Sequence, residues 1–224
     1  KISNSNVIFA VINYNHLLYR KGFNEACNYL TNEVDASINN LPADVYSFFY
    51  LINSSKCAES ANNFNESIFF LMKGLELSKR LPAPENILRK GHIYKFLSAR
   101  YYSLKDYEMS LYYANLCINT FLPEFKNKIG TGVGYEFKAL STYKLTNNIE
   151  EALTYFEKAQ YIYTTRNNIS RFHFVEKLKA ELYIETEPDL ALVHIFKFLD
   201  YFETNNRKVH FTPGWLFVHE IMQK

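Results

Sequence analysis

The sequence repeats one short motif four times at nearly constant spacing. In each copy an aromatic or aliphatic residue is followed three positions later by Ala or Ser, and three positions after that by another aromatic residue. The copies begin at Phe23, Phe64, Tyr107 and Ile149, so successive copies lie 41, 43 and 42 residues apart. This period is about the length of one helical hairpin. The sequence therefore predicts stacked helical hairpins, an architecture suited to holding another molecule rather than to catalysis.

Each motif is predicted to open the second helix of a hairpin. A turn residue precedes it in every copy: Gly22, Asn63, Asp106 and Asn148. Asn and Asp can accept hydrogen bonds from the first amides of a helix, and the small residue of the motif lets a neighbouring helix approach closely. Helical runs upstream supply the first helices, over residues 7–20, 44–61, 85–103 and 128–145. A fifth hairpin is expected from residues 172–185 and 189–203, with Ala191 at the small position.

This arrangement resembles the tetratricopeptide repeat (TPR), most closely in the fourth unit, at Ala139-Leu140, Tyr143, Asn147-Asn148-Ile149, Ala152, Tyr155-Phe156 and Ala159. We expect an all-α fold: a right-handed α-solenoid of about five degenerate TPR-like hairpins with a C-terminal capping helix. The scarcity of Gly (7) and Pro (6) disfavours a strand-and-turn fold. One peptide-binding domain is expected over 1–224, with hairpins at about 7–40, 44–80, 85–121, 128–165 and 168–205, and the cap at 212–224.

Charge and cysteine content narrow the classes of function. A net charge of +2, with both signs mixed along the chain, lacks the basic footprint of a freestanding nucleic-acid binder. Basic pairs such as Arg89-Lys90 are expected at solvated helix ends. Cys27, Cys57 and Cys117 are odd in number and far apart, which favours buried reduced thiols over a disulfide or a metal site and points to the cytoplasm. The apolar start of the chain is too short to span a membrane and lacks a signal-peptide cleavage site.

No motif for catalysis or for a cofactor is found. The six histidines form no metal-binding pair with a carboxylate, and neither HExxH, CxxC nor a nucleophile elbow occurs. The glycine cluster from Gly130 to Gly134 lacks the strand and the Gly-Lys-Ser/Thr ending of a phosphate loop. We interpret it as a loop or loosened helix start, and as a possible hinge. The sequence thus predicts no enzyme, no cofactor and no metal.

The candidate functional residues lie on the inner stripe of the first helices, because these helices line the concave groove of such a solenoid. The stripe mixes amides, cations and aromatic rings, which suits an extended peptide. Amide side chains can bond its main chain, lysines can pair with its carboxylates, and aromatic rings can receive its apolar side chains. The predicted peptide-binding residues are Asn15, Asn53, Lys56, His92, Tyr102, Phe137, Lys144 and Tyr183.

The whole pattern resembles the C-terminal repeat domain of the peptide-pheromone receptors of Gram-positive bacteria, their phages and plasmids: the Rgg, PlcR, PrgX, NprR and Rap group with the arbitrium receptors. The resemblance rests on the degenerate 42-residue hairpins rich in Tyr, Phe, Asn and Lys, with segments such as 104–113. It implies a short signalling peptide as ligand, held by Asn15 and Asn53, and a homodimer. It also implies control of transcription through an N-terminal helix-turn-helix domain. Because the chain opens on Lys1, we expect that domain to be missing from it.

Two other functions are compatible with the sequence. A TPR scaffold or adaptor could use the same groove to join protein partners without a pheromone. A phosphatase or anti-activator of the Rap type would need a separate N-terminal helical bundle, of which this chain shows no sign.

Overall fold

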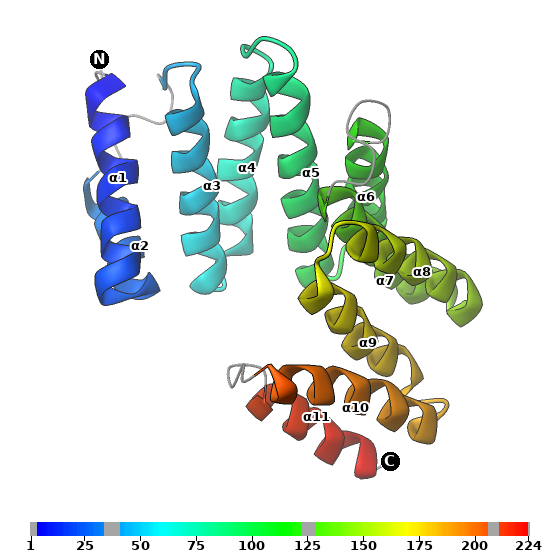
Figure 1. Ribbon diagram of the computed structural model, residues 1–224. Helices are drawn as coiled ribbons and strands as arrows, with labels where there is room; N and C mark the ends of the chain where they lie inside the picture. Colours follow the sequence, from blue (N-terminus) through cyan, green and yellow to red (C-terminus); the bar gives the residue numbers. More distant parts are fainter. Residues whose placement is uncertain (1–3, 34–40, 122–128, 206–210, 224) are drawn as a thin grey trace. The chain divides into compact units, whose positions relative to one another are not determined.

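Helices and short turns alternate along the computed structural model, which describes residues 4–33, 41–121, 129–205 and 211–223. Within these ranges the chain forms eleven helices and no strand (Figure 1). The helices are α1 (Asn4–Lys21), α2 (Phe23–Glu33), α3 (Val45–Ser60), α4 (Phe64–Ser78), α5 (Glu85–Ser103), α6 (Tyr107–Phe121), α7 (Ile129–Thr146), α8 (Ile149–Thr165), α9 (Ile169–Tyr183), α10 (Pro188–Thr204) and α11 (Phe211–Met222).

Consecutive helices pair into five hairpins, α1/α2 to α9/α10, and α11 follows them. The predicted all-α fold, a TPR-like solenoid with a final capping helix, is confirmed. Packing divides the chain into two compact units, Lys1–Thr120 and Phe121–Lys224, whereas the sequence suggests one domain. We call them unit 1 and unit 2 and describe each by itself. Of the expected hairpin boundaries, residues 34–40, 128 and 224 lie outside the described residues.

The repeated motif has the predicted register. Its small residues occupy the helix contacts, where each is completely buried: Ala26, Ser67, Ser110, Ala152 and, in the fifth hairpin, Ala191. Where the small residue is Ser, its hydroxyl is also satisfied. The Ser67 hydroxyl lies 2.8 Å from that of Ser55 on the paired helix, and the Ser110 hydroxyl lies 3.4 Å from that of Ser98, which also donates to the Ser110 carbonyl at 2.9 Å. The motif therefore marks the close approach of two helices.

Four of the turns share one construction, in which a residue with positive φ precedes a capping side chain. Asn62, Lys105, Asn147 and Asn167 have φ between 52° and 62°. The next residue in each case is Asn or Asp, and its side-chain oxygen accepts from the amide three positions on: Asn63 from Glu66, Asp106 from Met109, Asn148 from Glu151, and Asn168 from Arg171. Asn tolerates the left-handed conformation and both residue types cap helices, so many of the chain's asparagines have a local structural role.

The glycine cluster forms the first turns of α7, so of the two interpretations the helix start is correct and the loop is wrong. Gly130, Gly132 and Gly134 all lie in α7 and are buried. A Cβ added to Gly130 would come within 2.5 Å of the Phe121 ring, and one added to Gly132 within 2.6 Å of the Tyr163 ring. Both positions therefore need glycine for close packing rather than for flexibility.

A buried polar group stabilises the packing of unit 2 beside these glycines. The Glu136 side chain is almost completely buried, and Tyr163 donates its hydroxyl to Glu136 Oε1 at 2.6 Å. Arg171 Nε donates to the same oxygen at 2.8 Å and its guanidinium forms an ion pair with the carboxylate. Burial alone would lower the pKa of Arg171, but the Glu136 carboxylate outweighs it and raises that pKa above its ordinary value. The three side chains thus satisfy one another inside the unit.

The C-terminal helix α11 covers α10. Its buried face contributes Val218 and Ile221 to the core of unit 2, together with Phe198 and Leu199 of α10. Its other face is apolar and exposed at Trp215, Leu216 and Met222. None of the helices in the part of the chain that the structure describes is long and apolar enough to cross a membrane.

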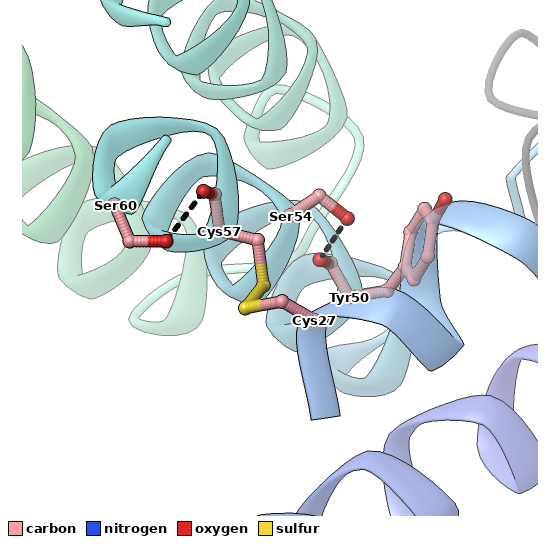
Figure 2. Close-up of a disulfide and its surroundings, with 5 residues drawn as sticks. All are labelled: Cys27, Tyr50, Ser54, Cys57 and Ser60. Atoms are coloured by element: carbon pink, nitrogen blue, oxygen red, sulfur yellow. Dashed lines mark hydrogen bonds between the residues drawn. A yellow bond between two sulfur atoms is a disulfide. The ribbon is translucent and has the colours of Figure 1, made fainter. Parts of the chain in front are cut away.

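Cys27 and Cys57 form a disulfide, so the prediction of three reduced thiols is wrong for this pair. The bond joins α2 to α3 (Figure 2), with Cα atoms 5.3 Å apart, a normal separation for a disulfide. The two residues are 30 positions apart in the sequence, and only the packing of the first hairpin on the second brings them together. Cys117 is a buried free cysteine, as expected. The cytoplasmic location inferred from reduced thiols loses this support.

Candidate functional site

Polar, cationic and aromatic side chains gather on the face shared by α3 and α5, the first helices of the second and third hairpins. We call this the α3–α5 surface. Phe49, Asn53 and Lys56 follow one another at intervals of four and three residues, which places them on one stripe of α3. Arg89, His92 and Phe96 are spaced at similar intervals on α5. The two helices contact each other at both ends of these stripes, through Arg89 on Phe49 at one end and Lys56 on Phe96 at the other. Both stripes therefore lie on the same side of the helix pair.

Asn53 lies at the middle of the α3 stripe. Its side chain is nine-tenths buried, yet its carboxamide makes no hydrogen bond to any residue that the structure describes. An amide in this position can donate two hydrogen bonds and accept two. The two amide atoms are not fully shut off from solvent, so they stay open to a polar ligand that pairs with both of them and excludes water from them. This makes Asn53 the strongest of the predicted binding residues.

Next to Asn53, two lysines share one aromatic ring. Lys56 Nζ of α3 lies 5.8 Å from the centre of the Phe96 ring, and Lys95 Nζ lies 4.2 Å from it. The ring holds both ammonium groups by cation–π attraction. Lys56 forms no ion pair within the described ranges. The centre of the surface is therefore cationic and can receive a carboxylate.

The two ends of the surface are closed by arginines. The Arg89 guanidinium lies 4.7 Å from the Phe48 ring centre and 5.1 Å from that of Phe49, and it pairs with Glu85 one turn away. Arg89 is thus packed against aromatic rings, so the prediction that it lies at a solvated helix end is wrong. At the other end, buried Arg100 of α5 forms a two-pronged ion pair with Glu59 of α3 and donates Nε to Ser67 Oγ at 3.0 Å.

The other predicted residues of unit 1 lie in different surroundings. The exposed Asn15 donates its amide to the Val11 carbonyl of its own helix at 2.9 Å, so its side chain already has a partner. His92 is half-buried on the α3–α5 surface, one turn before Phe96. The Tyr102 ring lies 5.4 Å from that of Tyr107, at the turn into α6. Of this group only His92 joins Asn53 and Lys56.

The three predicted residues of unit 2 come from two helices, Phe137 and Lys144 from α7 and Tyr183 from the end of α9. Phe137 is half-buried in α7, and Lys144 is exposed in the last turn of the same helix, with its ammonium 5.7 Å from the Tyr143 ring. Tyr183 is buried, and its ring stacks on that of His194 at 5.6 Å. Burial raises the pKa of Tyr183, and nearby Glu187 adds to this. Tyr183 is a packing residue in this arrangement.

A second polar cluster in unit 2 escapes sequence reasoning, because its members come from three helices. Glu176 of α9 accepts from Gln160 Nε2 at 2.6 Å and contacts His194 Nδ1 at 2.8 Å, while Lys179 donates to Gln160 Oε1 at 2.8 Å. Burial alone would raise the pKa of Glu176, but hydrogen bonds from His194 and Gln160 outweigh it and hold that pKa at about 2. A carboxylate held in its charged form is a poor general acid, so we assign this cluster to packing.

The chain matches no protein-family model and no curated protein sequence. It is similar in fold to two solved structures of a putative kinesin light chain from Podospora anserina, described as nearly identical TPR-like repeats. One of them, a point variant, has a TM-score of 0.63 and 10% identity over 92% of this chain and all of that one. The other has a TM-score of 0.60 and 10% identity, covering 91% and 99%. At this identity the likeness establishes the TPR-like fold and nothing beyond it.

Proposed function

We propose that this chain is a non-enzymatic binding module that holds a short linear peptide on the α3–α5 surface. The observation that carries the proposal is the Asn53 carboxamide, largely buried and without a partner among the described residues. A peptide main chain offers an N–H and a C=O at each residue, which is the pair of groups that one carboxamide can satisfy at once. Asn15, Tyr102 and Tyr183 are left out of the proposed site because each is engaged elsewhere.

The chemistry beside Asn53 indicates what kind of peptide fits. Lys56 and Lys95, gathered on the Phe96 ring, favour a carboxylate, supplied by an acidic side chain or by the C-terminus of the peptide. Phe49 is two-fifths exposed and can receive an apolar side chain two or three residues away. The proposed ligand is therefore a short peptide that combines an acidic group with an apolar one.

The biological role that we propose follows the resemblance seen in the sequence. In that reading the peptide is an intracellular signal, and its binding controls a transcription regulator to which this domain belongs. A scaffold that grips a linear segment of a larger protein would use the same surface. The length and source of the bound segment distinguish the two: a free peptide signal is bound as an isolated short chain, whereas a scaffold partner is recovered as an intact protein.

Calorimetry with matched variants tests the proposal. Peptides of about eight residues are selected from a displayed random library against the domain, and the tightest is titrated into wild type and variants. Asn53→Ala should weaken binding about five- to a hundredfold, because about 1 to 3 kcal/mol is lost when a buried polar partner is left unpaired. Lys56→Ala should weaken binding more at low salt than at high salt. Asn15→Ala is the matched control, since the Asn15 amide bonds its own helix, and it should leave affinity unchanged.

Two results would contradict the proposal. One is a selected peptide that binds wild type and Asn53→Ala equally well. The other is a selection that yields no peptide at all while an intact protein partner binds the domain with an affinity that Asn53→Ala does not alter.

A further inference from the structure

The disulfide between Cys27 and Cys57 lies at the floor of a pocket in unit 1. The pocket has a volume of about 280 Å³. At about 30 Å³ for each water in the liquid, this is room for roughly nine waters or a small molecule with about as many non-hydrogen atoms. Ala58 and Phe70 complete the buried floor, and the rim is formed by exposed side chains: Asn24, Asn28, Ser60 and Glu66. Both cysteines line this pocket although each is largely buried, so a small solute that enters it meets the two residues that carry the bond without unfolding of the surrounding helices.

The polar groups nearest the bond do not close the pocket. Ser54 Oγ donates to the Tyr50 carbonyl at 3.0 Å, and Ser60 Oγ donates to the Cys57 carbonyl at 2.8 Å. Figure 2 shows both hydroxyls directed at main-chain oxygens of α3. Neither hydroxyl is hydrogen-bonded across the pocket to another lining side chain.

We propose that this disulfide is a redox switch, opened in the folded protein by small thiols that enter the pocket, and that it controls how firmly the first hairpin is held to the second. In the first step a thiolate attacks one sulfur of the bond, a mixed disulfide forms, and the other cysteine leaves as a thiolate and takes up a proton. A second thiol then attacks the mixed disulfide. The products are two cysteine thiols and one small-molecule disulfide, so the two electrons come from the two thiols.

The positions of the cysteines in their helices indicate which sulfur leaves first. Cys27 lies in the second turn of α2, near its N-terminal end, whereas Cys57 lies in the last turn of α3. The N-terminal end of a helix favours a negative charge and the C-terminal end disfavours it. Attack on Cys57 with departure of the Cys27 thiolate is therefore the favoured first step. Glu66 on the rim disfavours anionic thiols and favours cationic ones.

The consequence for the fold is local to unit 1. The bond ties α2 to α3 across 30 residues of chain, part of which connects the two hairpins. When it is reduced, the first hairpin keeps its own contacts, such as the hydrogen bond from Asn13 to Tyr29 at 3.1 Å, but it loses its covalent link to α3. We expect α1 and α2 to open more often while α4 and α5 stay as protected as before.

The test compares two small thiols of opposite charge on the oxidised protein. Cysteamine is cationic and 2-mercaptoethanesulfonate is anionic, and each rate is divided by the rate of the same thiol with a small uncharged disulfide. Samples are quenched, alkylated without denaturant and mapped by mass spectrometry. Cys117 is the internal reference, because its thiol is buried and burial raises its pKa to about 12. It should stay unlabelled as long as the fold is intact.

We expect Cys27 and Cys57 to become labelled together and Cys117 to stay unlabelled. The normalised rate should be roughly threefold or more higher for cysteamine at low ionic strength, and this preference should vanish in Glu66→Gln or at high salt. Hydrogen exchange should then speed up in α1 and α2 alone. Parallel labelling of all three cysteines, equal normalised rates, unchanged exchange in α1 and α2, or a protein that forms no disulfide after mild oxidation would each overturn the proposal.

Discussion

Replacing Gly132 with Ala tests whether the glycines of α7 serve close packing. Ala is about 1 kcal/mol better than Gly in a helix interior, so propensity alone predicts a more stable protein. The structure predicts the reverse, because the new Cβ would lie 2.6 Å from Tyr163 Cε1 and 2.7 Å from Cζ. The Tyr163 ring is completely buried and cannot move outward without cost. Overpacking of this kind costs about 1 to 3 kcal/mol.

Moving the ring has a second cost. Tyr163 donates its hydroxyl to Glu136, and a shift that stretches this bond leaves a buried hydroxyl unpaired, which costs about 1 to 3 kcal/mol. Set against the propensity gain, the net loss for Gly132→Ala is about 1 to 5 kcal/mol, or a fall of roughly 2 to 20 °C in melting temperature for a chain of this length.

Gly74→Ala is the matched control for this prediction. Gly74 is also a buried glycine inside a helix, but the closest atom to its new Cβ would be the end of the Ile93 side chain, at 3.3 Å, and the other neighbours lie at ordinary van der Waals distance. A small rotation of the buried Ile93 relieves this contact at a cost that offsets part of the propensity gain, so we expect a change between zero and a gain of about 1 kcal/mol. Both variants are measured by urea and thermal unfolding followed by far-UV circular dichroism. The reasoning is refuted if Gly132→Ala is as stable as wild type, or if Gly74→Ala loses as much stability as Gly132→Ala.

Three further predictions follow from the turns, the C-terminal helix and the Glu176 cluster. Lys105→Asn should raise the free energy of unfolding by about 0.5 to 1 kcal/mol, because Lys105 has φ of 62° and Asn tolerates this conformation better. Asn147→Lys should lower the free energy of unfolding for the same reason. Equal unfolding midpoints for the two variants would contradict this prediction. Deleting residues from Phe211 onward should uncover Phe198 and Leu199 and cause aggregation or a large fall in melting temperature. We also propose that the exposed face of α11 forms a homodimer contact, which light scattering on the intact chain tests. The pKa of Glu176 is held at about 2, below its ordinary 4.5, so its contribution to stability is present above pH 4.5 and is lost as the pH falls toward 2. Glu176→Gln should therefore flatten the acid side of a curve of stability against pH. An unchanged acid side would show that the pair with His194 contributes nothing to stability.

The features that could be predicted from the sequence are local and periodic. Ala152 and its counterparts are buried at helix contacts because a small residue is required once in each hairpin, where its two helices approach closely. Asn148 and Asp106 cap helices because their side chains reach amides only three residues away. Asn53 and Lys56 could be placed on one stripe because helical spacing is regular. Each of these depends on the sequence within a turn or two.

The features that could not be predicted depend on residues far along the chain. Gly132 is glycine because of Tyr163, which the sequence around Gly132 does not reveal. The pairing of Cys27 with Cys57 depends on how one hairpin packs on the next. Arg89 looked like a surface residue because Phe48 and Phe49 belong to another hairpin. For the candidate site, spacing could select the stripe but could not tell that the Asn15 amide is engaged and that of Asn53 is not.

The most direct test of the account is the side-chain amide resonance of Asn53, observed in protein labelled with ¹⁵N at asparagine and assigned by its disappearance in Asn53→Ala. The account predicts that a selected peptide shifts this resonance and slows its exchange with water, because the amide gains a hydrogen-bond partner on the peptide. The Asn15 side-chain amide, bonded to its own helix, should stay where it is. A peptide that binds tightly while the Asn53 amide resonance does not move would show that the α3–α5 surface is not the binding site.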